Sequence, residues 1–141
     1  MTDLVVWIPG EPRGKGRPRF ARMPKGVCAY KDARTESYEG LVTLAATRAL
    51  ASRIGTFDSR PVSVAVTAYL RKSKGRKKTD LYPTKKPDVN NVVAAILDGL
   101  TQAGVWVDDS YVAELHARKL WATPDQEPGV RVRIVGMTER A

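Results

Sequence analysis

Three carboxylates flank one predicted helix, and they are the residues in this chain best suited to chemistry. Asp88 precedes the apolar run that starts at Val92, and Asp108 and Asp109 follow that run just after Gly104. Crowded carboxylates repel one another unless a positive group lies between them, and hard divalent cations take carboxylate oxygens as ligands. The pattern therefore indicates a candidate metal site able to act on a phosphate ester.

Each of these carboxylates also has a simpler explanation. An Asp between a Pro and an apolar periodic run is typical of a helix N-cap, and paired Asp residues are common in turns. A helix of about 13 residues spans only about 20 Å, and a tight return after Gly104 would bring the chain back along it. The spacing leaves open whether Asp109 then approaches Asp88. Asp98 lies inside the helix, and we interpret it as a structural or partner-facing residue.

Positive charge is concentrated in two segments, 13–34 and 71–86. Each contains eight Lys or Arg residues and one acid, so together they contribute +14 to a net charge of +9, and the rest of the chain sums to −5. Such segments are typical of phosphate binding, although solvated loops that keep a protein soluble have similar composition. The candidate nucleic-acid-binding cations are Lys15, Arg17, Arg19, Arg71, Lys72, Lys74, Arg76, Lys77, Lys78, Lys85 and Lys86.

The loop 14–20 (GKGRPRF) combines glycines, which allow close approach of the backbone, with cations that suit phosphates. It lacks the Gly-to-Lys-Ser/Thr spacing of a P-loop, which argues against an ATPase. Phe20, Tyr30 and Tyr82 are interleaved with the basic segments. They would stack on unpaired bases or serve ordinary loop packing, and the sequence favours neither.

The elements that must position these residues alternate between strands and helices. Period-two alternation predicts strands at 4–8, 62–70, 112–121 and 130–135, with a short one at 105–107. Helical periodicity predicts one helix from about Thr35, with Thr35 as its N-cap, and a second from Asp88 to 103. We interpret 10–34 and 71–86 as basic loops. The order β-α-β-α-β-β predicts an α/β (α+β) fold in a single domain spanning 1–141.

Composition narrows the class of protein. At 141 residues and 43% hydrophobic content the chain suits one domain with an ordinary core. The N-terminus resembles neither a signal peptide nor a membrane span, so we expect a cytoplasmic protein. The lone cysteine, Cys28, excludes an intrachain disulfide and argues against a cysteine zinc site. The only histidine, His116, falls in a predicted strand with no Ser-His-Asp arrangement around it.

Three stretches of this sequence resemble the RusA family of Holliday junction resolvases of bacteria, prophages and phages. They cover most of the chain, from about residue 5 to about residue 120. The stretches are WIPGEP (7–12) with KGRPRF (15–20), KPDVNN (86–91) running into AILDGL (95–100), and VWVDDSYV (105–112).

The resemblance implies an α/β fold with a mixed sheet and two helices. It implies a homodimeric, Mg²⁺-dependent endodeoxyribonuclease, with Mn²⁺ as a substitute, that resolves four-way DNA junctions by paired symmetric nicks in recombination and repair. Carried over by position, the catalytic residues are Asp88, Asp108 and Asp109. These three and Asn90 are the implied metal ligands.

Two positions depart from the family pattern. Asn90 stands where a second Asp is usual, and Ala94 replaces a lysine that is sometimes present. An Asn oxygen can ligate a hard cation but brings no charge, so metal affinity should fall. A non-catalytic protein that binds branched DNA is therefore the main alternative. A basic RNA-binding or ribosome-associated protein is another, whereas a PD-(D/E)xK nuclease is disfavoured because no acid-x-Lys element follows Asp88.

Overall fold

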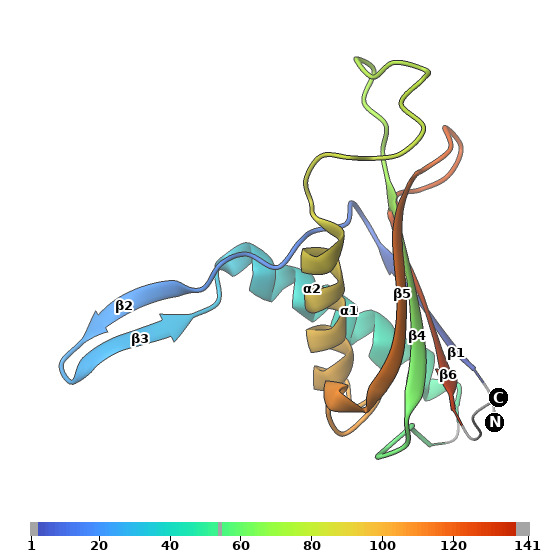
Figure 1. The fold of residues 1–141 in the computed structure, drawn as a ribbon. Coiled ribbons are helices and arrows are strands. Elements are labelled where there is room, and N and C mark those ends of the chain that lie inside the picture. The colour runs from blue at the N-terminus through green and yellow to red at the C-terminus, as the bar shows by residue number, and fades with distance from the viewer. Residues whose placement is uncertain (1–2, 54, 138–141) are drawn as a thin grey trace.

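A four-stranded sheet with two helices on one face forms the body of the protein, and a two-stranded hairpin projects away from it (Figure 1). The computed structural model describes residues 3–53 and 55–137. The strands are β1 (Leu4–Pro9), β2 (Arg19–Met23), β3 (Gly26–Tyr30), β4 (Val62–Leu70), β5 (Val112–Trp121) and β6 (Gly129–Gly136). The helices are α1 (Ala33–Ala51), α2 (Val89–Gln102) and the short 3-10 helix η1 (Asp109–Tyr111).

The sheet has the strand order β1-β6-β4-β5. β6 pairs antiparallel with both β1 and β4, whereas β5 runs parallel to β4. The sheet is therefore mixed, and the α+β class with two principal helices is confirmed. The parallel β4–β5 pair requires a crossover, and α2 supplies it over the helical face of the sheet.

The core lies between this face of the sheet and the two helices. The alternating residues of β4, from Val62 to Leu70, are buried on that face, as the sequence predicts. The predicted apolar stripe of α1 is also confirmed, since Tyr38, Val42 and Ala46 are buried. The helices pack closely because α2 has Gly99 at the crossing, where a Cβ atom would overlap Val42.

Three local predictions are wrong. Segment 10–34 is not a continuous loop, because β2 and β3 form a hairpin within it. The first helix begins at Ala33, with Asp32 as its N-cap and Thr35 inside the first turn. The strand predicted at 105–107 is reduced to an isolated bridge between Trp106 and Asp58.

The ends of α2 agree with the prediction. Asp88 occupies the N-cap position, and Gly104, just beyond the C-cap residue Ala103, has a φ of 80°. That left-handed conformation favours glycine and turns the chain away from the helix axis. In the described part of the chain, neither helix is long and apolar enough to cross a membrane.

Candidate functional site

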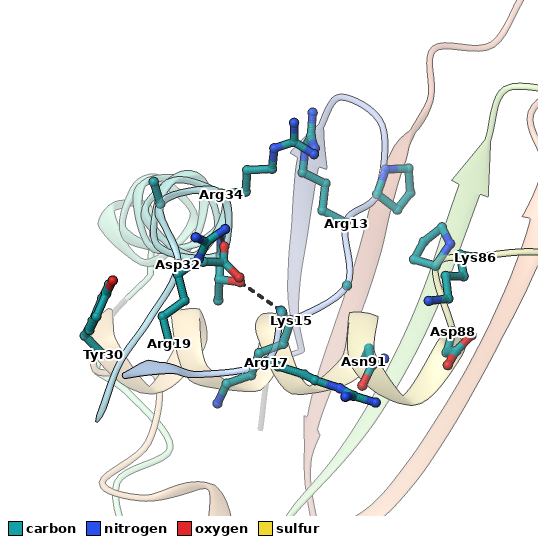
Figure 2. Close-up of a pocket in the computed structure, with 16 residues that line it drawn as sticks. Arg13, Lys15, Arg17, Arg19, Tyr30, Asp32, Arg34, Lys86, Asp88 and Asn91 are labelled. Carbon is teal, nitrogen blue, oxygen red and sulfur yellow. Dashed lines mark hydrogen bonds between the residues drawn. The ribbon is translucent and has the colours of Figure 1, made fainter. Parts of the chain in front are cut away.

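A basic cleft of about 1190 Å³ lies between the first basic segment and the N-terminal ends of α1 and α2. Figure 2 shows its charged side chains arriving from the loop after β1, from α1 and from the segment before α2. Its two carboxylates are Asp32 and Asp88. The cations in its wall are Arg13, Lys15, Arg17, Arg19, Arg34 and Lys86.

Gly14 and Gly16 allow the loop that lines this cleft to pass close to both helices. The backbone N–H of Lys15 donates to the Asn91 carbonyl at 2.9 Å, and the N–H of Gly16 donates to Thr35 Oγ1 at 2.8 Å. A Cβ on Gly14 would lie 3.0 Å from that of Asn91, and one on Gly16 would overlap the Asp32 carboxylate. The glycines therefore let the backbone dock against α2 on one side and α1 on the other.

Lys15 is already paired within the protein. Its Nζ lies 2.6 Å from the Asp98 carboxylate, and this hydrogen bond raises the pKa of Lys15, with smaller contributions from Glu39 and Asp109. Of the two roles expected for Asp98, structural or partner-facing, this contact agrees with the structural one. DNA binding by Lys15 stays a prediction, and the pair with Asp98 neutralises part of the charge it would offer a phosphate.

Asp88 keeps its carboxylate available although it occupies the N-cap of α2. Its side chain is exposed and makes no capping hydrogen bond, so the helix start does not account for the acid group. The Lys119 ammonium donates to the carbonyls of Lys85 and Pro87, both at 2.9 Å, and holds the segment before Asp88 against β5. The Asp88 carboxylate, which makes no capping bond, therefore lies at the end of a cationic cleft.

Asp108 and Asp109 lie beyond the other end of α2. The Trp106 indole donates to Thr101 Oγ1 at 2.7 Å, and this bond holds the segment before Asp108 against the C-terminal end of α2. Asp108 accepts from the backbone N–H of Ser110, and the hydroxyl of Ser110, followed by this N–H, lowers the pKa of Asp108. Asp109 begins η1 and is exposed.

One chain therefore does not bring Asp88 together with Asp108 and Asp109. The 14 residues of α2 separate them along the helix by about 20 Å. β5 gives an independent measure of this separation. Lys119 of β5 bonds to the Pro87 carbonyl beside Asp88, whereas Val112 of β5 directly follows η1. These two residues are seven positions apart, which is about 23 Å along a strand. Across residues 3–53 and 55–137, no three His, Cys, Asp or Glu side chains gather to hold a metal ion.

Asn90 and Asn91 differ in their relation to the cleft. Both are exposed in the first turn of α2, but the cleft wall includes Asn91 and not Asn90. Metal ligation by Asn90 stays a prediction. Sequence reasoning missed Asn91, Arg13 and Arg34. The two arginines were visible in the charge count of their segment, but no pattern distinguished them from their neighbours.

The second basic segment contributes little to the cleft, since only Lys86 of its cations reaches the wall. Two others pack on the body: the Arg76 guanidinium lies 5.6 Å from the Trp121 ring and 3.9 Å from the Asp80 carboxylate, and Lys72 donates to the Asp80 carbonyl. The remaining cations are exposed away from the cleft wall, namely Arg71, Lys74, Lys77, Lys78 and Lys85.

The fold and the cleft define a small α+β protein with a strongly basic cleft that ends at a free carboxylate. Residues 9–135 match the family described as endodeoxyribonuclease RusA, and the chain belongs to this family. The uncharacterized protein YqaN of Bacillus subtilis (strain 168) is 32% identical over 144 residues, which cover 95% of this chain and 96% of that protein. The resemblance found in the sequence is confirmed, and the chain is a member of a family of DNA-cleaving enzymes.

Proposed function

We propose that this protein is a structure-specific endodeoxyribonuclease that resolves four-way DNA junctions by paired symmetric nicks. Membership of the RusA family supports the nuclease class. The observation that carries the proposal is the exposed carboxylate of Asp88, which makes no capping hydrogen bond and lies in the wall of a cleft with six cations. Those cations would neutralise backbone phosphates and hold one DNA strand next to Asp88.

Mg²⁺, or Mn²⁺ in its place, is the proposed cofactor. Asp88, Asp108 and Asp109 offer the hard oxygen donors that these ions prefer, with Asn90 as a neutral fourth. When bound, such an ion activates water and neutralises charge on the reacting phosphate. The donor chemistry fits, but the two ends of α2 are too far apart for one chain to supply the whole set.

A homodimer would complete the site. β5 is an edge strand whose residues 113–118 are all exposed, including Leu115 at 43%. Antiparallel pairing of two β5 strands would extend the sheet and cover this edge. Because α2 lies over β5, the two α2 helices would then run antiparallel, and Asp88 would face Asp109 of the partner subunit. Two-fold symmetry supplies two such sites, one for each nick.

Mixing two inactive variants tests both the residues and the dimer. Asp88→Asn and Asp109→Asn should each reduce nicking of a labelled four-way junction by about 100-fold or more, as expected for loss of a metal-site carboxylate. In a mixed dimer one composite site loses both carboxylates and the other keeps both. We therefore expect single nicks to return on mixing, in Mg²⁺ or Mn²⁺ and not with chelator, without paired cleavage.

Binding measurements separate catalysis from folding in the same experiment. Asp88→Asn should bind the junction as well as the parent protein or more tightly, because it removes a negative charge from the cleft. Asp125→Asn, an exposed carboxylate between β5 and β6, is the matched control and should cut normally. Absence of nicks from every mixture would contradict a composite site, and loss of junction binding by Asp88→Asn would identify Asp88 as a structural cap.

A non-catalytic protein that binds branched DNA is the second candidate, and Asn90 in place of the usual Asp favours it. Such a protein would bind the junction and leave it uncut in either metal. Asn90→Asp should then create nicking activity by adding a charged ligand. Competition with a linear duplex and a structured RNA tests the substrate class, because equal competition by RNA would contradict both candidates.

A further inference from the structure

A second hollow, of about 340 Å³, lies beside the cleft on the surface of α1. Arg13, Ala33 and Arg34 line both the cleft and the hollow, so they form the rim between the two. Ser37, Tyr38 and Leu41 complete the wall of the hollow. Figure 2 shows the side chains of Arg13, from the loop, and Arg34, from α1, converging at this rim.

The rim brings two like charges together with no carboxylate between them. None of the residues that line the hollow is acidic. Within the described residues, neither the Arg13 nor the Arg34 guanidinium forms an ion pair with an Asp or Glu side chain. Two guanidinium groups at one rim repel each other, and a bound anion would relieve that repulsion.

Tyr38 adds a hydrogen-bond donor that has no acceptor. The residue is only 5% exposed, and its hydroxyl has no hydrogen-bond partner within normal geometry in the described part of the chain. Burial raises the pKa of Tyr38 to about 12, although the nearby backbone and guanidinium of Arg13 act in the opposite direction. The hydroxyl therefore keeps its proton at neutral pH. A buried donor without an acceptor is uncommon, and an oxygen anion that reached it through a small movement of the wall of the hollow would satisfy it.

We infer that this hollow is a phosphate-binding subsite in which Arg13 and Arg34 pair with the anion and the Tyr38 hydroxyl donates to one of its oxygens. The inference deepens the proposed function and rests on it, because the shared rim makes the hollow a continuation of the DNA cleft over α1. The hollow has room for a phosphate with its attached sugar. A free phosphate group would present the same chemistry to these three side chains.

Removal of one oxygen atom tests the inference most directly. Tyr38→Phe keeps the buried ring and removes only the hydroxyl, so the melting temperature should stay the same or rise. Affinity for a four-way junction at low salt should fall by about 3- to 10-fold if the hydroxyl contacts a phosphate. Arg34→Gln should lower the slope of log K against log salt by about one. Arg48→Gln is the matched control, because Arg48 is exposed on the same helix about 21 Å further along.

Inorganic phosphate supplies a readout that does not depend on DNA. Compared with chloride at equal ionic strength, phosphate should raise the melting temperature of the parent protein and of Arg48→Gln, and should have much less effect on Tyr38→Phe and Arg34→Gln. A phosphate response without any junction affinity would support the subsite for a free phosphate compound and would contradict the proposed function. A lower melting temperature for Tyr38→Phe with unchanged phosphate response and unchanged junction affinity would overturn the inference.

Discussion

The two basic segments have the same charge composition and different structures. Residues 13–34 and 71–86 each hold eight cations and one acid. The first segment docks against both helices, forms the β2–β3 hairpin and supplies five of the six cations in the cleft wall. The second is largely irregular, packs Lys72 and Arg76 near Trp121, and gives the cleft only Lys86.

The difference shows that anchoring, rather than the number of charges, decides which cations can act together. The first segment is held at Lys15 and Gly16 by hydrogen bonds to two different helices, so Arg17 and Arg19 leave the body at a fixed place. In the second segment the contacts hold the base of the loop, and its outer cations Lys74, Lys77 and Lys78 are exposed. Substitutions in one segment with matched partners in the other test this comparison.

The largest effect is expected from Gly16→Ala. The new Cβ would overlap the Asp32 carboxylate, so either that carboxylate gives up its N-cap bond with the Thr35 N–H or the loop moves away from the start of α1. We expect the melting temperature to fall by several degrees and junction affinity to fall by about 10-fold or more, since either change would misalign several of the cations proposed to meet phosphates. Gly75→Ala in the second segment meets no atom within 4 Å and should leave both quantities unchanged.

Equal effects from the two glycine substitutions would break the comparison, because they would mean that the docking of the first loop does not position its cations. Thermal melting by circular dichroism and fluorescence anisotropy with a labelled junction measure the two quantities. A fall in melting temperature with unchanged affinity for Gly16→Ala would separate stability from DNA binding.

A smaller effect is expected from removing charge. The double variant Arg17→Gln, Arg19→Gln should reduce the slope of log K against log salt by about two, because each phosphate that is no longer neutralised lowers the slope by about 0.9. Lys77→Gln, Lys78→Gln removes the same charge from the second segment and should reduce the slope by less than about one, because those side chains lie outside the cleft wall. A larger reduction in slope for Lys77→Gln, Lys78→Gln than for Arg17→Gln, Arg19→Gln would assign the main phosphate-binding role to the second segment.

The smallest effect is expected from Asp98→Asn, which breaks the anchor of Lys15. Both side chains are partly exposed, at 35% and 28%, so the loss in free energy of unfolding should be about 0.2–1 kcal/mol at pH 7. Asp98 raises the pKa of Lys15, so this stabilisation is complete below about pH 10 and disappears as the pH rises through the raised value.

Thermal melts from pH 7 to 11 measure that dependence. The difference between the parent protein and Asp98→Asn should be constant to about pH 10 and then shrink as Lys15 loses its proton. Asp3→Asn is the control, because its partner Arg133 does not lose its proton in this range. A difference for Asp98→Asn that persisted to pH 11 would mean that the pair acts through packing and not through charge.

The strand with the clearest alternation in the sequence, β4, is one that buries a face of the sheet. β4 and β5 have the predicted bounds, 62–70 and 112–121, and the buried residues of β4 follow its alternation. The hairpin could not be predicted in the same way. Its ten strand residues are exposed except Ala21, which is half-buried, so no core imposes an alternating pattern on β2 and β3.

Only part of the candidate site could be predicted, because the sequence indicates Asp88, Lys15, Arg17, Arg19 and Lys86 but neither Arg13, Arg34 and Asn91 nor the arrangement of these residues. The Pro-Asp step before an apolar run placed Asp88 correctly at the start of α2. The pair between Lys15 and Asp98 joins residues 83 positions apart, and local periodicity has no information about it. The separation of Asp88 from Asp109 follows from the direction of β5, which only the parallel pairing with β4 defines.

The exposed hairpin also affects how the protein would respond to proteolysis. Arg22 and Lys25 lie at or beside the turn between β2 and β3, away from the core, where a trypsin-like protease can cut without disturbing the sheet. Such a nick would leave β1 on one fragment, still paired with β6 on the other. We expect the two fragments to remain associated and folded, so that the protein would migrate as two bands on a denaturing gel and as one species on a sizing column.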